Sequence, residues 1–182
     1  MNMLLRFFIM ISLLKRELKL TPKHSTLSQS ELQAPITQHY SILPQDMGWR
    51  NHLPNYRYLS FIELNITNWL ISCCHKKGIK MLRWVMAMQE VVYLKQVSFL
   101  DKLEVTSRLL GWDEKYLYFE HQFFVKQQLR AVGLTKIILV DAQGKRAPSE
   151  LDLAGVNLND IIQTWNANQD AIKAKFAKRY TN

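Results

Sequence analysis

The chain has 182 residues, of which 48% are hydrophobic and 21% are charged, a balance that excludes a disordered chain and fits one globular domain with a tail. Its 24 lysines and arginines outnumber 15 aspartates and glutamates and give a formal net charge of +9, which favours polyanionic partners such as anionic lipid or coenzyme A. We do not expect nucleic acid as a partner, because the sequence has no run of more than two basic residues and no groove-reading motif.

The N-terminal residues 3–14 are strongly apolar, interrupted by Arg6 and Ser12 and followed by basic residues. The stretch is too short to cross a bilayer, which needs about 20 apolar residues. It also lacks the charged start and the small-residue cleavage site of a signal peptide. We predict a helix that docks on its own domain, with peripheral contact between residues 3–14 and a membrane surface as the other option. Residues 20–35 are rich in Ser, Thr, Gln and Pro and predict a connector without a core.

A strand and a long helix follow, separated by a polar cluster. Residues 37–43 alternate in polarity and predict a strand that ends at Pro44. The cluster from Asp46 to Asn55 comes directly before an apolar stripe at helical spacing, which predicts a buried helix over residues 54–77. Gly78 fits the position after the helix C-terminus. A polar cluster at a helix N-terminus is a place where the helix dipole favours negative charge.

The rest of the chain predicts a sheet and a last helix. Four alternating segments predict strands, and their short connections favour an antiparallel meander; they are residues 83–94, 101–110, 115–126 and 129–140. Gly133 predicts a bulge or a close approach of another element. A helix is predicted from Asn157 onward, with Asn159 as its N-cap.

The two cysteines, Cys73 and Cys74, are adjacent in the predicted central helix. Vicinal cysteines there cannot form an unstrained disulfide, so we expect free thiols and a reducing, cytoplasmic location. Neither cysteine has metal-ligand spacing to a histidine, and no metal site is predicted.

One strand, a long buried helix and four antiparallel strands form the element order of the hotdog fold, an α+β fold in which a curled antiparallel sheet wraps a long central helix. The polar residues Asp46, His52, Asn55 and Tyr58, followed by Glu63, resemble the motif of hotdog acyl-CoA thioesterases of the 4-hydroxybenzoyl-CoA thioesterase-like group. The resemblance implies a hotdog domain over residues 36–151. Residues 1–35 would add an N-terminal helix and connector, and residues 152–182 a C-terminal helix.

The same resemblance implies what the protein does. It implies hydrolysis of acyl-CoA or acyl-carrier-protein thioesters, with no cofactor beyond the coenzyme A of the substrate. It also implies a homodimer, or a dimer of dimers, whose sheets join edge to edge and whose substrate binds at the subunit boundary. Backbone N–H groups at the helix N-terminus would polarise the thioester carbonyl, and a carboxylate would act as base or nucleophile.

Each candidate catalytic residue has an alternative, structural role. Asp46 or Glu63 could be the base, although Asp46 could instead accept loop N–H groups and Glu63 could pair with Arg57 or Arg50. His52 and Asn55 could position water and the carbonyl, or make local hydrogen bonds only.

Three further residues are candidates for substrate binding. Arg50 could pair with a substrate carboxylate or a coenzyme A phosphate, or form a salt bridge with Asp46 or Glu63. Trp49 could line an acyl pocket or be a core residue, and Tyr58 matches the family's helix aromatic. With the motif aligned without gaps, Gly48 stands where the family has its usual catalytic aspartate. A protein that binds acyl groups or acyl-CoA without hydrolysis is therefore the alternative function.

Overall fold

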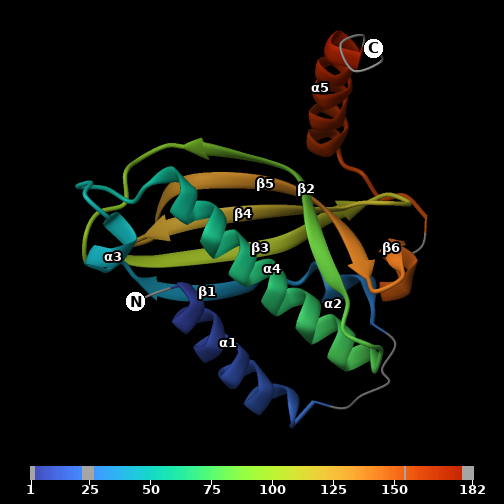
Figure 1. The fold of residues 1–182 in the computed structure, drawn as a ribbon, viewed down its shortest axis with the longest axis horizontal. Helices are drawn as coiled ribbons and strands as arrows, with labels where there is room; N and C mark the ends of the chain where they lie inside the picture. Colours follow the sequence, from blue (N-terminus) through green and yellow to red (C-terminus); the bar gives the residue numbers. More distant parts are fainter. Residues whose placement is uncertain (1–2, 22–26, 154, 178–182) are drawn as a thin grey trace.

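A six-stranded antiparallel sheet wraps a long helix, α4 (Asn55–Lys77), in the computed structural model, which describes residues 3–21, 27–153 and 155–177 (Figure 1). The strands follow the order β1-β3-β4-β5-β2, with β6 paired to β5. Their bounds are β1 (Ile36–Ser41), β2 (Arg83–Tyr93), β3 (Lys102–Trp112), β4 (Leu117–Val125), β5 (Gln128–Asp141) and β6 (Gly144–Arg146). The expected α+β hotdog architecture is confirmed.

The prediction of a simple meander is wrong in one respect. Strands β3, β4 and β5 are consecutive neighbours, but β2 pairs with β5 at the far edge of the sheet. After β2 the chain crosses to β3, which lies beside β1. Alternation of side chains shows which residues are strands but not which strands are neighbours, because each strand edge offers the same backbone groups. The result leaves β2 as an edge strand whose outer side has no partner among the described residues.

Helix α4 confirms the helix predicted over residues 54–77. Pro54 precedes it in an extended conformation (φ −64°, ψ 148°), and Gly78 ends it in the left-handed region (φ 68°), where glycine carries no steric cost. Phe61, Ile62 and Ile66 are fully buried on its inner face. Gly133 on β5 allows this contact, because a Cβ there would lie 3.2 Å from Ile62 Cδ1. The expected irregularity at Gly133 is thus a close approach of α4.

Two short helices were missed by the sequence analysis. Helix α2 (Gln29–Gln33) lies in the segment predicted as a coreless connector, yet its Leu32 is buried. A capping box between Ser28 and Glu31 stabilises its first turn, and the Trp69 Nε1–H donates to the Leu32 carbonyl at 2.9 Å. Helix α3 (Pro44–Met47) is a single turn that carries Asp46. Helices this short have too few residues for an apolar period to be visible.

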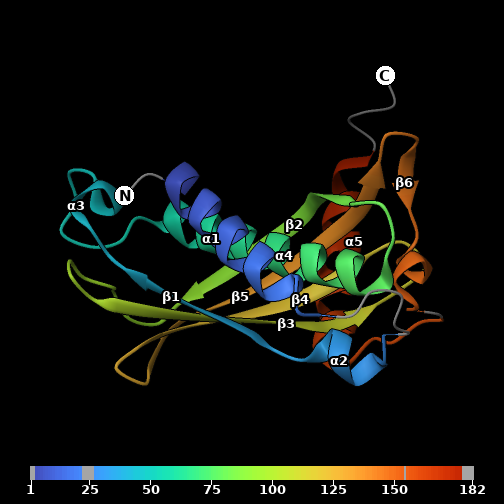
Figure 2. The same cartoon turned by 90° about the horizontal axis from the view of Figure 1, so that it is seen from below.

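The N-terminal helix, α1 (Met3–Leu18), lies alongside α4 (Figures 1 and 2). It buries Met10, Leu14 and Leu18, so the predicted docking of this helix on its own domain is confirmed. No helix among the described residues is long and apolar enough to cross a membrane.

The C-terminal helix, α5 (Asp160–Ala177), begins as predicted. The Ile162 N–H donates to Asn159 Oδ1 at 3.0 Å, the geometry of an N-cap. Ile162 and Trp165 pack on the outer face of the sheet around Tyr118, and the rest of α5 projects away from the body (Figure 1). A 3-10 turn, η1 (Pro148–Leu151), precedes it. The proposed domain boundaries stay predictions.

A chain of polar side chains crosses the core beneath α4. Asn65 Nδ2 donates to Ser107 Oγ at 2.9 Å, and Ser107 Oγ lies 2.7 Å from His121 Nδ1. The other ring nitrogen of His121, Nε2, lies 2.9 Å from Thr135 Oγ1. Because the Ser107 hydroxyl accepts from Asn65, its own proton is free for Nδ1, which leaves the proton of a neutral imidazole on Nε2. Burial lowers the pKa of His121 to about 3, so its ring is neutral.

This histidine makes stability depend on pH. Its pKa in the folded protein is far below the ordinary 6.5, so below pH 6.5 the unfolded chain binds the extra proton and the folded chain does not. We expect the free energy of unfolding to fall with decreasing pH, by roughly 3 kcal/mol from this group at pH 4.5. Urea unfolding at a series of pH values measures the slope. The slope should flatten in His121→Gln but not in His39→Gln, which changes an exposed ring; equal slopes would contradict the assignment.

Candidate functional site

A pocket at the N-terminus of α4 brings together three of the predicted site residues. It has a volume of 280 Å³ and is lined by His52, Asn55 and Tyr58, with Leu53 between them in the chain. The other wall is the end of β2 and the loop after it, formed by Tyr93, Leu94, Lys95 and Gln96. The polar cluster before the helix therefore faces a cavity, as a binding site requires. We refer to it as the α4 N-terminal pocket.

Two tyrosines close the inner side of this pocket. Tyr58 is buried and meets the rings of Tyr93 and Phe123 edge to face, at centroid distances of 5.1 Å and 5.0 Å. Burial, with a smaller contribution from Tyr93, raises the pKa of Tyr58 to about 12, so its hydroxyl is protonated at neutral pH. The Tyr93 hydroxyl donates to the Asn55 carbonyl at 3.5 Å. Tyr93 and Lys95 were missed, because only the return of β2 to the helix brings them to the site.

The first turn of α4 has no side-chain cap. Pro54 makes no cap hydrogen bond, and the Asn55 N–H has no acceptor among the described residues. An uncapped first turn presents backbone donors and the positive end of the helix dipole. Next to it, His52 Nδ1 lies 2.9 Å from Asn51 Oδ1, a local contact of the kind expected as its structural role. This end of α4 is suited to polarise a carbonyl oxygen.

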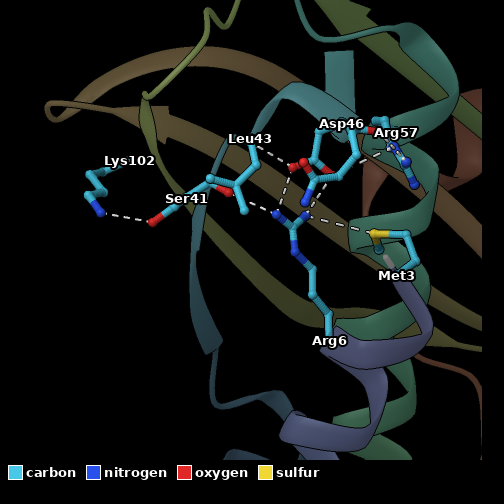
Figure 3. Close-up of polar contacts among 8 residues, drawn as sticks. Met3, Arg6, Ser41, Leu43, Asp46, Arg57 and Lys102 are labelled. Atoms are coloured by element: carbon cyan, nitrogen blue, oxygen red, sulfur yellow. Dashed lines mark hydrogen bonds and ion pairs between the residues drawn. The ribbon is translucent and has the colours of Figure 1, made fainter. Parts of the chain in front are cut away.

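Asp46 lies outside this pocket, in a buried ion pair with the N-terminal helix (Figure 3). Arg6 holds both carboxylate oxygens, from Nη1 at 3.0 Å and from Nη2 at 2.7 Å. The Leu43 N–H donates to Asp46 Oδ2 at 3.0 Å, and Arg57 Nε lies 3.8 Å from Oδ1. Both Arg6 and Asp46 are almost fully buried. The Asp46 carboxylate therefore connects α1, α3 and α4. It also accepts a loop N–H, from Leu43, which was predicted as its alternative role.

Gly48 has a backbone reason to be glycine. It ends α3 with φ 61° and ψ −127°, a conformation that side chains with a Cβ rarely adopt. Trp49 and Arg50 follow in the exposed loop, where Trp49 is 87% exposed and the Arg50 guanidinium lies 4.6 Å from its ring centroid. Trp49 is thus not a core residue, and Arg50 pairs with neither Asp46 nor Glu63.

Glu63 lies in a second cavity, which we call the Glu63 groove. The groove has a volume of 340 Å³ between α1, α4 and the start of β2, and its other lining residues are Met3, Leu4, Phe7, Ser60, Leu64, Thr67 and Trp84. Glu63 itself is exposed, and partial desolvation by these residues raises the pKa of its carboxyl above the ordinary value. Within the described part of the chain no hydrogen bond or ion pair engages this carboxylate. The predicted pairing with Arg57 or Arg50 is not formed, because Arg57 turns toward Asp46 and the Gln45 carbonyl.

The two cavities lie at opposite ends of the same edge strand. Trp84 at the start of β2 lines the Glu63 groove, and Tyr93 at its end lines the α4 N-terminal pocket. Along α4, Asn55 and Glu63 are eight residues and about 12 Å apart. One carbonyl group cannot contact both in a single chain. Cys73 and Cys74 are buried free thiols remote from both cavities, and in the described ranges no cluster of His, Cys, Asp or Glu could hold a metal ion.

The model of a protein family, the thioesterase-like superfamily, matches residues 42–160. The match includes α4, the strands β2 to β6 and all seven predicted site residues. A curated relative, a probable thioesterase of Saccharomyces cerevisiae, is 33% identical over 60 residues. That alignment covers 32% of this chain and only about a quarter, 26%, of the yeast protein.

Solved structures support the fold. A Staphylococcus aureus protein in complex with CoA superposes with a TM-score of 0.57 at 14% identity, covering 68% of this chain and 82% of that one. A 1,4-dihydroxy-2-naphthoyl-CoA thioesterase from Synechocystis has a TM-score of 0.55 at 11% identity, covering 65% and 92%. At such identities the likeness is one of fold.

Proposed function

The chain belongs to the thioesterase-like superfamily, and we propose that it hydrolyses acyl thioesters of coenzyme A. Two features carry the proposal: an uncapped helix N-terminus that faces a pocket, and an unpaired carboxylate of raised pKa in the groove at the other end of β2. Two fold neighbours, one in complex with CoA and the other a thioesterase of a CoA thioester, support this carrier, as does the net charge of +9. Acyl carrier protein, which presents the same thioester on pantetheine, is the other carrier.

The reaction needs a hydrogen-bond donor that polarises the thioester carbonyl, a base and a water molecule. It needs no cofactor beyond the coenzyme A of the substrate. The thioester oxygen accepts a hydrogen bond from the Asn55 N–H, and the helix dipole stabilises the negative charge that develops there. Glu63 removes a proton from water as the water oxygen bonds to the carbonyl carbon. The carbon–sulfur bond then breaks, and the proton passes to the coenzyme A thiolate. His52 positions the water or carbonyl, while Arg50, Trp49 and Tyr58 contact the substrate.

Two chains complete one such site. The separation of about 12 Å between Asn55 and Glu63 along α4 requires that they come from different protomers. We propose a homodimer in which the edge strands β2 pair antiparallel. A twofold axis at Met88, the middle of β2, sets Trp84 of one chain opposite Val92 of the other. That pairing joins the Glu63 groove of each protomer to the α4 N-terminal pocket of its partner. Val85 and Val92 on β2, 52% and 53% exposed in the single chain, become buried.

The alternative is a protein that binds acyl-CoA without hydrolysis. It is favoured by Gly48 at the usual aspartate position and by Asp46, whose carboxylate oxygens are already engaged by Arg6. If this alternative holds, acyl-CoA binds but no free coenzyme A is released.

Release of free coenzyme A from a panel of acyl-CoAs tests the proposal. We expect Glu63→Gln to lower kcat/KM by about 100-fold or more, since general-base catalysis contributes roughly that much. The rate should also rise with pH through a pKa above the ordinary 4.5, because the working form of Glu63 is the carboxylate and partial desolvation raises its pKa. Glu114→Gln, an exposed change in the β3–β4 turn, is the matched control. Wild-type protein that binds but turns over no member of the panel would establish the alternative.

A further inference from the structure

The outward face of α1 carries large apolar side chains that nothing in the described structure covers. Four of them are 43–58% exposed: Leu5, Phe8, Ile9 and Leu13. They lie in the first three turns of the helix, whose other residues Met10 and Leu14 pack on the body. A contiguous exposed apolar surface of this kind marks an interaction site. We propose that this face binds the surface of an anionic lipid bilayer.

The orientation of this face is fixed by buried contacts on the other side of the helix. Arg6 reaches inward to Asp46 and to the Ser41 carbonyl, at 2.8 Å from Nη2 (Figure 3). Its guanidinium also lies over the rings of Phe61 and Tyr40, at 5.2 Å and 5.7 Å from their centroids. Turning the apolar face toward the body would carry Arg6 away from its partners and leave the buried Asp46 carboxylate without its main counter-charge, which is costly. The buried contacts of Arg6 therefore hold the exposed apolar side chains of α1 outward.

Charge identifies the partner as an anionic surface. On the same outward side, the last turns of α1 and the residue after it carry the exposed basic side chains Lys15, Arg16 and Lys19. Apolar side chains that enter the headgroup boundary, flanked by cations that meet lipid phosphates, are the features of an interfacial helix. With 16 residues, α1 is about 24 Å long. In the proposed complex its axis lies parallel to the bilayer surface. A second copy of the chain is a poorer match, because a twofold contact through α1 would bring these cations into the interface.

The proposal is independent of hydrolysis and is tested by flotation with vesicles. We expect the full chain to float with vesicles that contain phosphatidylglycerol, and more weakly with pure phosphatidylcholine. The double variant Phe8→Gln/Leu13→Gln should partition at least about tenfold more weakly, because two apolar side chains leave the headgroup region. Lys15→Gln and Arg16→Gln should each cost about fivefold on anionic vesicles. Ile172→Gln on α5 and Lys145→Gln on β6 are the matched exposed controls and should bind like wild type.

The apolar and basic positions are all exposed, so these variants should fold; circular dichroism and the melting temperature confirm this in the same samples. Wild-type protein that stays with the unbound fraction, or a Phe8→Gln/Leu13→Gln variant that floats as well as wild type, would overturn the proposal. A change in oligomeric state caused by that variant in analytical ultracentrifugation, without an effect on flotation, would assign the face to a second copy of the chain instead.

Discussion

Purified heterodimers with Glu63→Gln in one chain and Asn55→Pro in the other are expected to hydrolyse acyl-CoA at about half the wild-type rate. Each homodimeric variant should be almost inactive. In the heterodimer one composite site receives both substitutions and the other receives neither, so one of the two sites is intact. Co-expression with two affinity tags and tandem purification yields this species, and coenzyme A release measures its rate.

Asn55→Pro is chosen because it removes a backbone donor and little else from the helix. Asn55 is the first residue of α4, where an N–H has no intrahelical acceptor and proline is well tolerated. The preceding Pro54 is already extended, with ψ 148°, as a residue before proline must be. Loss of one oxyanion donor should cost about 100-fold to 1000-fold in kcat. Asn55→Ala is the control that removes the side chain but keeps the N–H, and it should retain more activity.

A silent heterodimer would place Glu63 and Asn55 of the same chain in one site, because each site would then carry one of the two substitutions. Full activity of Asn55→Pro would show that the helix N-terminus does not polarise the carbonyl. Wild type paired with Glu63→Gln is the reference species, since it has one intact site whichever chain supplies each residue.

The fold was largely predictable because its main signals are periodic. The apolar stripe of α4 and the alternation along β2 to β5 follow directly from helix and strand geometry, and Gly78 marks the helix end by its left-handed conformation. The neighbours of β2 were not predictable, since a strand's own sequence does not name its partners. Helix α2 could have been found, because the sequence from Ser28 to Glu31 is a capping box signature.

The site was predictable only in part. His52, Asn55 and Tyr58 share one pocket, because they are near one another in the sequence and at one end of a helix. The separation of Glu63 from them also follows from helix geometry. By contrast, the partner of Asp46 is 40 residues away. The one available signal was Arg6, which interrupts the apolar stretch of residues 3–14. A charge buried where such a helix docks on the body needs a counter-charge, and Arg6 could therefore have indicated an ion pair.

Arg6→Met is expected to lower the free energy of unfolding by about 3–5 kcal/mol, since it leaves the buried Asp46 carboxylate without its main partner. Methionine is unbranched and fills the space of the aliphatic part of arginine, so the loss reports the charge more than a cavity. Arg57, whose Nε is 3.8 Å from Asp46 Oδ1, offsets part of this loss of stability. Urea denaturation at neutral pH measures the change, and Arg16→Met on the exposed side of the same helix should shift stability by no more than about 0.5 kcal/mol.

The double variant Arg6→Met/Asp46→Asn separates the ion pair from other effects of the substitutions. Asparagine still accepts the Leu43 N–H through its side-chain oxygen but carries no charge. The double variant should therefore be more stable than the sum of the two single losses implies, by a coupling energy of about 1–3 kcal/mol. Strictly additive losses would mean that Arg6 and Asp46 act separately, and α1 would then be held on α4 by Met10, Leu14 and Leu18 alone. A coupled loss identifies the buried pair as the contact that fixes the orientation of α1, on which its outward apolar face depends.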